Sequence, residues 1–167
     1  MHLLPFADNP TLAGIGQTLI ARNQSIAVAE SVTAGLMQYG FSTIKDSSSF
    51  FQGGITVYNV GQKVKHLHVE PIHAIKVNCV SGQVVTQMAV NVCQMFCSTW
   101  GIASAGYASP VPESGMQIFA FYAIVKEGRM IFTDRITLPE GDPSDYQPAY
   151  ALQIIEKFNL VLLNDRN

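Results

Sequence analysis

Two segments of the chain combine residue types that could carry out nucleophilic chemistry on a carbonyl compound. The first is Glu30-Ser31-Val32-Thr33-Ala34-Gly35, which follows the apolar run 25–29 and precedes a helical pattern. A serine between a strand and a helix lies beside free backbone N–H groups at the positive end of the helix dipole, which suits an anion or an oxyanion. The alternative is that Ser31 or Thr33 only caps the helix.

The second segment contains the serines Ser47, Ser48 and Ser49, followed by Tyr58 and Lys63. A lysine that is desolvated enough to be partly neutral can deprotonate a serine, and a nearby tyrosine can hold or relay the proton. Serine, tyrosine and lysine would then form a nucleophile and base set that needs no histidine. The alternative is that the serines lie in a solvated loop and that Lys63 is a surface charge.

The histidines and cysteines give little support for a metal site. His66, His68 and His73 lie close together, but no cysteine or paired carboxylate joins them at ligand spacing, so we predict surface histidines and no metal. The three cysteines match neither a disulfide framework nor a zinc knuckle, and we predict buried free thiols. They are Cys79, Cys93 and Cys97.

The remaining patterns predict the elements that position these residues. With 167 residues, of which 48% are apolar and 13% charged, the chain fits a single domain over 1–167. Helical periodicity predicts helices at 11–22, from 36 to about 41, and at 59–67, 81–99 and 144–163. Strands are predicted at 25–29, 50–58, 101–106, 116–125 and 130–138, the last two as a hairpin. This order predicts an α/β fold, a single-domain α/β/α sandwich with a mixed sheet.

Charge and hydropathy narrow the function classes. Ten Lys and Arg against twelve Asp and Glu give a net charge of −2, without blocks of one sign, so we predict no nucleic-acid partner. Apolar stretches are interrupted well before the length of a membrane span, and the first residues lack the features of a signal peptide. We therefore predict no membrane partner and a cytoplasmic location.

Several of these motifs occur in the order and spacing of a known family. The segments are Ala29-Glu30-Ser31-Val32-Thr33-Ala34-Gly35-Leu36, Asp46-Ser47-Ser48-Ser49-Phe50-Phe51-Gln52-Gly53-Gly54, Val57-Tyr58-Asn59 with Lys63, Val80-Ser81 with Val84, Met88 and Ala89, and Gly106-Tyr107-Ala108-Ser109-Pro110. The series resembles the CinA C-terminal domain family, whose first segment typically reads A-E-S-C-T-G-G-L. The match covers nearly the whole chain.

The resemblance implies a nicotinamide-nucleotide amidohydrolase, which converts nicotinamide mononucleotide to nicotinic acid mononucleotide and ammonia without a metal or cofactor. By position, either Ser31 or Ser48 attacks the amide carbon, Lys63 acts as base and then as acid, and Tyr58 orients them. We favour Ser31, whose turn offers N–H groups to a tetrahedral oxyanion, and Ser48 would then either bind substrate or support the residues that do. The resemblance further implies substrate contacts from Glu30, Thr33, Gly35, Ser47, Asn59, Gly106 and Ser109.

The chain also departs from the family pattern. The smaller changes are Val32 for a cysteine, Ala34 for a glycine and Ala105 for a threonine or serine. Pro143 stands where the family has an arginine after Gly141-Asp142, which removes a bidentate partner for a substrate phosphate. Either Arg135 or Lys65 compensates for this loss, or the ligand is different.

Three hypotheses follow. The first is an amidohydrolase acting on nicotinamide mononucleotide or a related small amide. The second is a catalytically impaired relative that serves as a nucleotide-binding or dimerising module. The third is a stand-alone partner of a nucleotide-pyrophosphatase domain, which we expect not to be fused here. Because compact α/β domains often pair with a second copy and family members tend to do so, we also expect a homo-oligomer.

Overall fold

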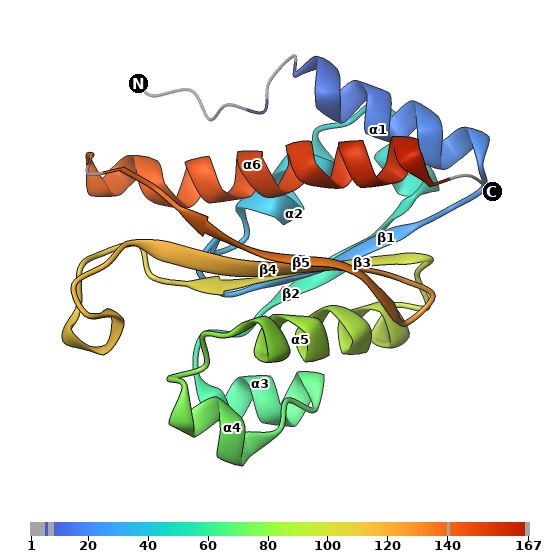
Figure 1. The fold of residues 1–167 in the computed structure, drawn as a ribbon. Helices are drawn as coiled ribbons and strands as arrows, with labels where there is room; N and C mark the ends of the chain where they lie inside the picture. The colour runs from blue at the N-terminus through green and yellow to red at the C-terminus, as the bar shows by residue number, and fades with distance from the viewer. Residues whose placement is uncertain (1–5, 7–8, 140, 166–167) are drawn as a thin grey trace.

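The computed structural model describes residue 6 and residues 9–139 and 141–165 of the chain. These residues form a five-stranded sheet with helices on both faces (Figure 1). The strands are β1 (Ile26–Glu30), β2 (Phe51–Thr56), β3 (Trp100–Gly106), β4 (Phe119–Lys126) and β5 (Arg129–Thr137). The α-helices are α1 (Pro10–Ala21), α2 (Leu36–Ser42), α3 (Val60–Leu67), α4 (Pro71–Lys76), α5 (Gly82–Met95) and α6 (Pro143–Asn164), and short 3₁₀ turns lie at η1 (Ser47–Ser49) and η2 (Pro112–Ser114).

The sheet is mixed, as the sequence predicted. Its strand order is β2-β1-β3-β4-β5; β1 pairs in parallel with β2 and β3, whereas β3, β4 and β5 pair antiparallel. Parallel strands need crossover connections. Helix α2 lies in the connection from β1 to its neighbour β2, and α3–α5 lie in the connection that leads from β2 past β1 to β3. Glu127 and Gly128 both have positive φ (50° and 74°), as the two-residue turn of a hairpin requires. The α/β class and the hairpin are thus confirmed.

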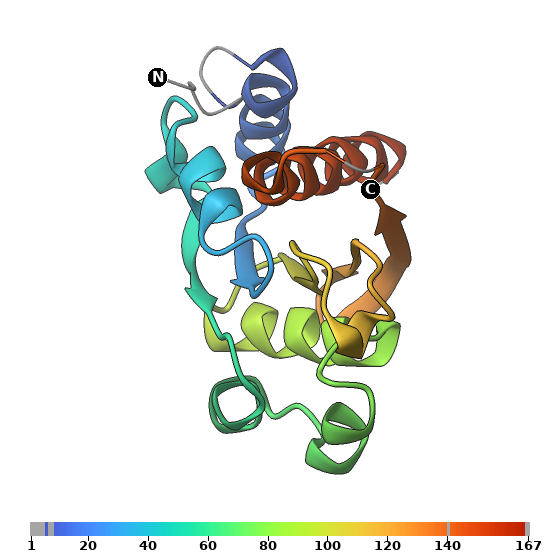
Figure 2. The ribbon, with the colours of Figure 1, turned by 90° about the vertical axis from the view of Figure 1, so that its left-hand side faces the viewer.

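Each face of the sheet is covered by its own helices, with α1, α2 and α6 on one side and α3, α4 and α5 on the other (Figures 1 and 2). Side chains of β1 alternate between the two cores: Ile26 and Val28 join the first, and Ala27 and Ala29 join the second. This double burial explains why the strand is apolar from Ile26 to Ala29 rather than alternating.

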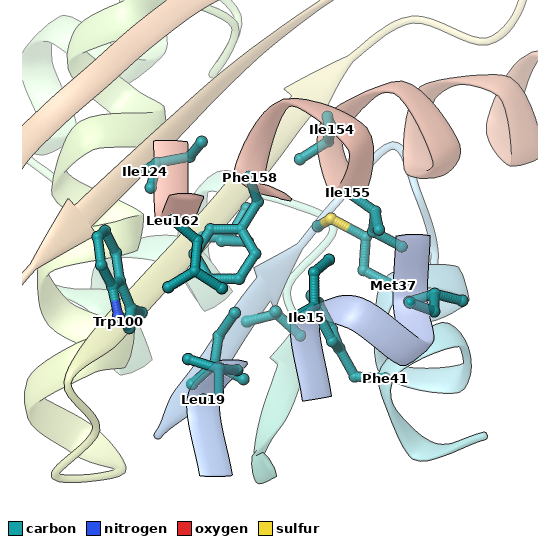
Figure 3. Packing of buried hydrophobic residues seen from close by; sticks show 14 of the residues in the cluster. Ile15, Leu19, Met37, Phe41, Trp100, Ile124, Ile154, Ile155, Phe158 and Leu162 are labelled. Carbon is teal, nitrogen blue, oxygen red and sulfur yellow. The ribbon is translucent and has the colours of Figure 1, made fainter. Parts of the chain in front are cut away.

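The first core is the more aromatic of the two. Trp100 from β3 and Phe158 from α6 are both fully buried, and their ring centroids lie 5.4 Å apart in an edge-to-face arrangement (Figure 3). Ile15 and Leu19 of α1 complete the contact between α1, α6 and the sheet (Figure 3).

The second core is built from smaller side chains, so that α5 approaches β3 closely. A Cβ atom added at Gly101 of β3 would collide with the carbonyl oxygen of Ala89 in α5. Glycine is therefore required at that position for this helix to pack where it does.

The structure differs from the predicted elements most clearly in two helices, and it starts the strand predicted at 116–125 at Phe119. Helix α4 was not predicted, because six residues are too few to show a helical period, although Glu70 caps it and Pro71 occupies its first turn. Helix α5 ends at Met95 rather than at residue 99, and Cys97 follows in a left-handed conformation (φ 50°).

The cysteines are therefore not all buried. Cys93 is buried within α5, Cys79 is half-buried, and Cys97 is exposed because it lies in the turn beyond the helix end. All three are free thiols, as predicted.

None of the helices in the described residues combines the length and the apolar character needed to cross a membrane.

Candidate active site

A cleft opens at the carboxyl ends of β1 and β3. Its volume is about 550 Å³, and its walls come from residues 31–32 after β1, 58–63 at the start of α3, 74–80 at the end of α4, and 106–109 after β3. Strand β1 lies between β2 and β3, so the connections that follow β1 and β2 lead to opposite sides of β1. The carboxyl end of β1 is therefore a topological switch point, which is where open α/β sheets bind their ligands. The cleft is of a size that suits a small molecule.

Lys63 lies at the base of the cleft. It is the fourth residue of α3, whose start is fixed by Asn59: the Asn59 Oδ1 atom accepts a hydrogen bond from the Gln62 amide at 3.1 Å. Although lysine is usually a surface residue, Lys63 is only 1% exposed. Its Nζ atom donates to the carbonyl oxygens of Val57 at 2.9 Å and Tyr58 at 3.2 Å, and it lies 3.0 Å from Ser31 Oγ.

The surroundings of Lys63 favour the neutral amine. Burial lowers the pKa of Lys63, and its electrostatic interaction with Cys79 opposes that shift only in part. No ion pair to Lys63 occurs within residues 9–139 and 141–165. A neutral amine can direct its two N–H bonds to the two carbonyl oxygens, which leaves its lone pair for the hydroxyl of Ser31. Lys63 is therefore positioned to accept the proton of Ser31.

Ser31 is the first residue beyond β1 and is 8% exposed at the cleft. The residue before it, Glu30, is completely buried and fixes the turn that carries Ser31. Its carboxylate accepts hydrogen bonds from the amides of Gly35 (3.0 Å), Met37 (3.1 Å) and Gln38 (2.8 Å). A buried carboxylate thus occupies the first turn of α2, in agreement with the helix dipole.

This arrangement corrects the interpretation of the first motif. The amides at the start of α2 already have an anionic acceptor within the chain, so they are not open to a substrate anion. Glu30 and Gly35 hold the turn instead of lining the cleft. Thr33 is likewise buried away from the cleft, where its hydroxyl lies 2.8 Å from that of Ser104 in β3.

The structure brings four further predicted residues to the cleft. Tyr58 lines it with a side chain that is 67% exposed, and its carbonyl oxygen contacts Lys63. Asn59, Gly106 and Ser109 also line it. Gly106 is required there, since a Cβ atom would lie 2.5 Å from the carbonyl oxygen of Phe119 on the neighbouring strand.

Ser47 and Ser48 are not brought to the cleft. They form the 3₁₀ turn before β2, whereas Lys63 follows the carboxyl end of β2, so the length of the strand separates them. Ser48 is exposed, and the Ser47 hydroxyl donates to the Ser42 carbonyl oxygen at 3.3 Å. Of the two serines considered as nucleophile, Ser31 is the one in contact with Lys63.

A family model decides the relationship of the chain. The model of the CinA C-terminal domain matches residues 9–158. The chain belongs to the CinA C-terminal domain family. A CinA-like protein of Synechococcus sp. is 38% identical over 105 residues, which cover 62% of this chain and 25% of that protein. Protein MG115 of Mycoplasma genitalium is 28% identical over 148 residues, which cover 89% of this chain and 94% of that protein.

Solved structures of CinA proteins share the fold. A competence damage-inducible protein A from Klebsiella pneumoniae has a TM-score of 0.88 at 22% identity, covering 94% of this chain and 98% of that one. A competence/damage inducible protein from Agrobacterium tumefaciens has a TM-score of 0.83 at 19% identity, covering 98% and 100%. The chain spans about a quarter of the length of the first cyanobacterial relatives, so it corresponds to one part of those proteins.

Several residues that line the cleft of this CinA domain were not singled out from the sequence. They come mainly from the unpredicted α4 and the turn after it, where Asn78 and Cys79 both have positive φ (49° and 61°). The Asn78 side chain donates to the Tyr107 hydroxyl at 3.1 Å, which joins two walls of the cleft. The Glu70-Pro71 pair, a capping residue followed by proline, is the signal that could have revealed this segment.

Cys79 lies close enough to Lys63 for the two to interact electrostatically. Burial raises the pKa of Cys79, and Lys63 offsets this only in part. The reactive form of cysteine is the thiolate, so the raised pKa makes the Cys79 thiol a weaker nucleophile at neutral pH than an ordinary cysteine.

The two cations considered as substitutes for the family arginine lie elsewhere. Arg135 of β5 packs over the Phe119 ring at 3.9 Å and donates to the Gln117 side chain at 2.9 Å. Lys65 is exposed on α3, and neither residue lines the cleft.

Two of the described histidines form hydrogen bonds within the chain rather than a shared site. His66 lies 3.0 Å from the Gln62 side chain, and His73 lies 2.9 Å from the Ser81 hydroxyl. In the part of the chain that the structure describes, no three His, Cys, Asp or Glu side chains are grouped as metal ligands.

Proposed function

We propose that the protein is an amidohydrolase that cleaves a small carboxamide with Ser31 as nucleophile and Lys63 as base. The observation that carries this proposal is the 3.0 Å contact between Ser31 Oγ and the Nζ atom of Lys63, a residue that is 1% exposed and whose amine donates to two carbonyl oxygens. A buried amine beside a serine, at the ligand-binding edge of the sheet, is an arrangement suited to nucleophilic catalysis.

In the first half of the reaction, Ser31 Oγ attacks the carbon of the carboxamide while Lys63 takes the hydroxyl proton. The tetrahedral intermediate collapses when Lys63 returns that proton to the nitrogen, so ammonia leaves and an ester to Ser31 remains. In the second half, Lys63 removes a proton from a water molecule, which attacks the ester. The carboxylic acid is released and Ser31 regains its proton, so the overall reaction consumes one water.

We expect the negative oxygen of the intermediate to be stabilised by the backbone amide of Val32. This amide comes directly after the nucleophile, Val32 lines the cleft, and the amide donates to no acceptor within residues 9–139 and 141–165. A donor of this kind, fixed before the reaction begins, is worth about 10²–10³ in rate. It replaces the amides at the start of α2, which Glu30 already occupies.

The substrate class follows from the family resemblance: nicotinamide mononucleotide or a related small amide. Ammonia release from purified protein tests the reaction. We expect both Ser31→Ala and Lys63→Met to lower turnover by at least about 10²-fold, because each removes a group that forms or breaks a bond.

The chain offers a matched control for each change. Ser48→Ala removes the other serine considered as nucleophile, and Lys65→Met removes an exposed lysine two residues along the same helix. Both controls should retain turnover. Equal loss in Ser31→Ala and Ser48→Ala would contradict the assignment of the nucleophile, and the absence of ammonia from all amides would favour a ligand-binding module.

A further inference from the structure

The cleft wall beyond Ser31 and Lys63 is made of uncharged groups. Aromatic rings come from Tyr58 and Tyr107, and an aliphatic surface comes from Val60, Ile75 and Val80. Asn59, Asn78 and Ser109 contribute neutral polar groups. Flat apolar or amphipathic walls with a few neutral hydrogen-bonding groups favour a planar ring over a strongly hydrated anion.

Lys63 is the one cationic residue that lines the described cleft, and the hydrogen-bonding positions of its amine are already occupied. Lys63 Nζ has three partners within 3.2 Å, and its burial disfavours the charged form that a phosphate would need. Arg135 is held against Phe119 and Gln117, away from the cleft. Phosphate groups are normally recognised by charge-assisted hydrogen bonds. The walls of this cleft offer apolar contacts and neutral hydrogen-bonding groups instead.

We infer that the cleft selects a carboxamide on a flat ring that carries no phosphate, with the ring packed against Tyr58, Tyr107 and Ile75. This inference rests on the proposed function, which it narrows to a substrate class. The cavity of about 550 Å³ leaves room for a ring with a further uncharged substituent.

A pair of amides that differ only in the phosphate tests this selection. Nicotinamide riboside and nicotinamide mononucleotide are compared by kcat/KM for ammonia release from the wild-type protein. We expect the riboside to be cleaved at least as efficiently as the mononucleotide. A higher kcat/KM for the mononucleotide would overturn the inference while leaving the amidohydrolase proposal in place.

If neither compound releases ammonia, a binding measurement still tests the selection against phosphate separately from the proposed hydrolysis. The affinities of both compounds are then measured by calorimetry with the same protein. Binding of the riboside at least as tight as that of the mononucleotide would support the inference although the proposed reaction had failed. Tighter binding of the mononucleotide, or no binding of either, would overturn it.

Two isoleucines of α4 provide a second, matched test. Ile75 lines the cleft and is 69% exposed, whereas Ile72 is 79% exposed on the same helix and lies outside the cleft lining. Ile75→Arg places a guanidinium at the cleft and should shift the ratio of mononucleotide to riboside affinity about tenfold towards the mononucleotide. Ile72→Arg should leave the ratio unchanged. Equal ratios in the two variants would count against the inference.

Discussion

The protonation of a single residue, Lys63, should set the pH dependence of the proposed reaction. Burial lowers the pKa of Lys63 from its ordinary value of 10.5, and the proposed base is the unprotonated amine. We therefore expect kcat/KM for ammonia release to rise as the pH rises through this lowered pKa, with a midpoint below 10.5. A pH–rate profile measures the midpoint. The residual activity of Lys63→Met should lack this rise, and a wild-type profile that is flat or has its midpoint above 10.5 would contradict Lys63 as the base.

At the same scale, the sequence predicted that Ser31 and Lys63 meet, which the structure shows, but not their environment. Ser31 and Lys63 could be found because their motifs have recognisable residue types and spacing. The strand predicted at 50–58 already places Ser48 before its amino end and Lys63 beyond its carboxyl end, so the separation of these two residues could have been found from the sequence. The role of Glu30 was hidden, because its partners are backbone amides, which every residue other than proline has.

At the scale of elements, the junction between β1 and α2 depends on Glu30. Its carboxylate accepts three buried or half-buried amide hydrogen bonds, and hydrogen bonds to a charged group are worth about 1.5–3 kcal/mol each. Glu30→Ala should lower the free energy of unfolding by at least about 3 kcal/mol, because it leaves these amides without an acceptor. Urea unfolding measures the change.

A second glutamate gives the control for this prediction. Glu113 is exposed in η2, and Glu113→Ala should change the free energy of unfolding by no more than about 0.5 kcal/mol. Glu30→Gln, which keeps one acceptor oxygen, should lie between the two. Similar stabilities for Glu30→Ala and Glu113→Ala would show that the buried carboxylate does not hold the turn.

Helices and strands differ in how well the sequence predicted them. The β4–β5 hairpin was found because Glu-Gly between two apolar runs is a strong turn signal, and α6 was found because it is long. Helix α4 was missed although it supplies one wall of the cleft. Short elements of this kind are set by contacts with the rest of the fold, and a local pattern does not contain those contacts.

At the scale of the whole molecule, we propose that the protein forms a homo-oligomer. Strand β5 is at one edge of the sheet, with Met130 52% and Ile131 48% exposed. An edge strand with exposed apolar side chains is a surface that can pair with a second copy. Light scattering should give a mass of at least twice the 18.2 kDa of one chain.

A lysine substitution in β5 tests whether this edge strand forms the interface between the copies. Ile131→Lys should shift the mass towards that of a single chain if β5 forms the interface, since a charge on an edge strand opposes pairing. Leu163→Lys, at a residue of α6 that is 57% exposed, is the control and should not change the mass. A wild-type mass of 18.2 kDa would contradict the oligomer itself.

The anchoring of Lys63 by main-chain carbonyl oxygens has an evolutionary consequence. Val57 and Tyr58 hold the amine through atoms that every amino acid possesses, so replacement of either side chain leaves both acceptors present. Descendants of this gene can therefore drift at the exposed position 58 and reshape the entrance to the cleft without losing either hydrogen bond to Lys63, whereas Val57 is also held by its place in the second core. Diversification of ligand preference can thus proceed separately from preservation of the proposed reaction.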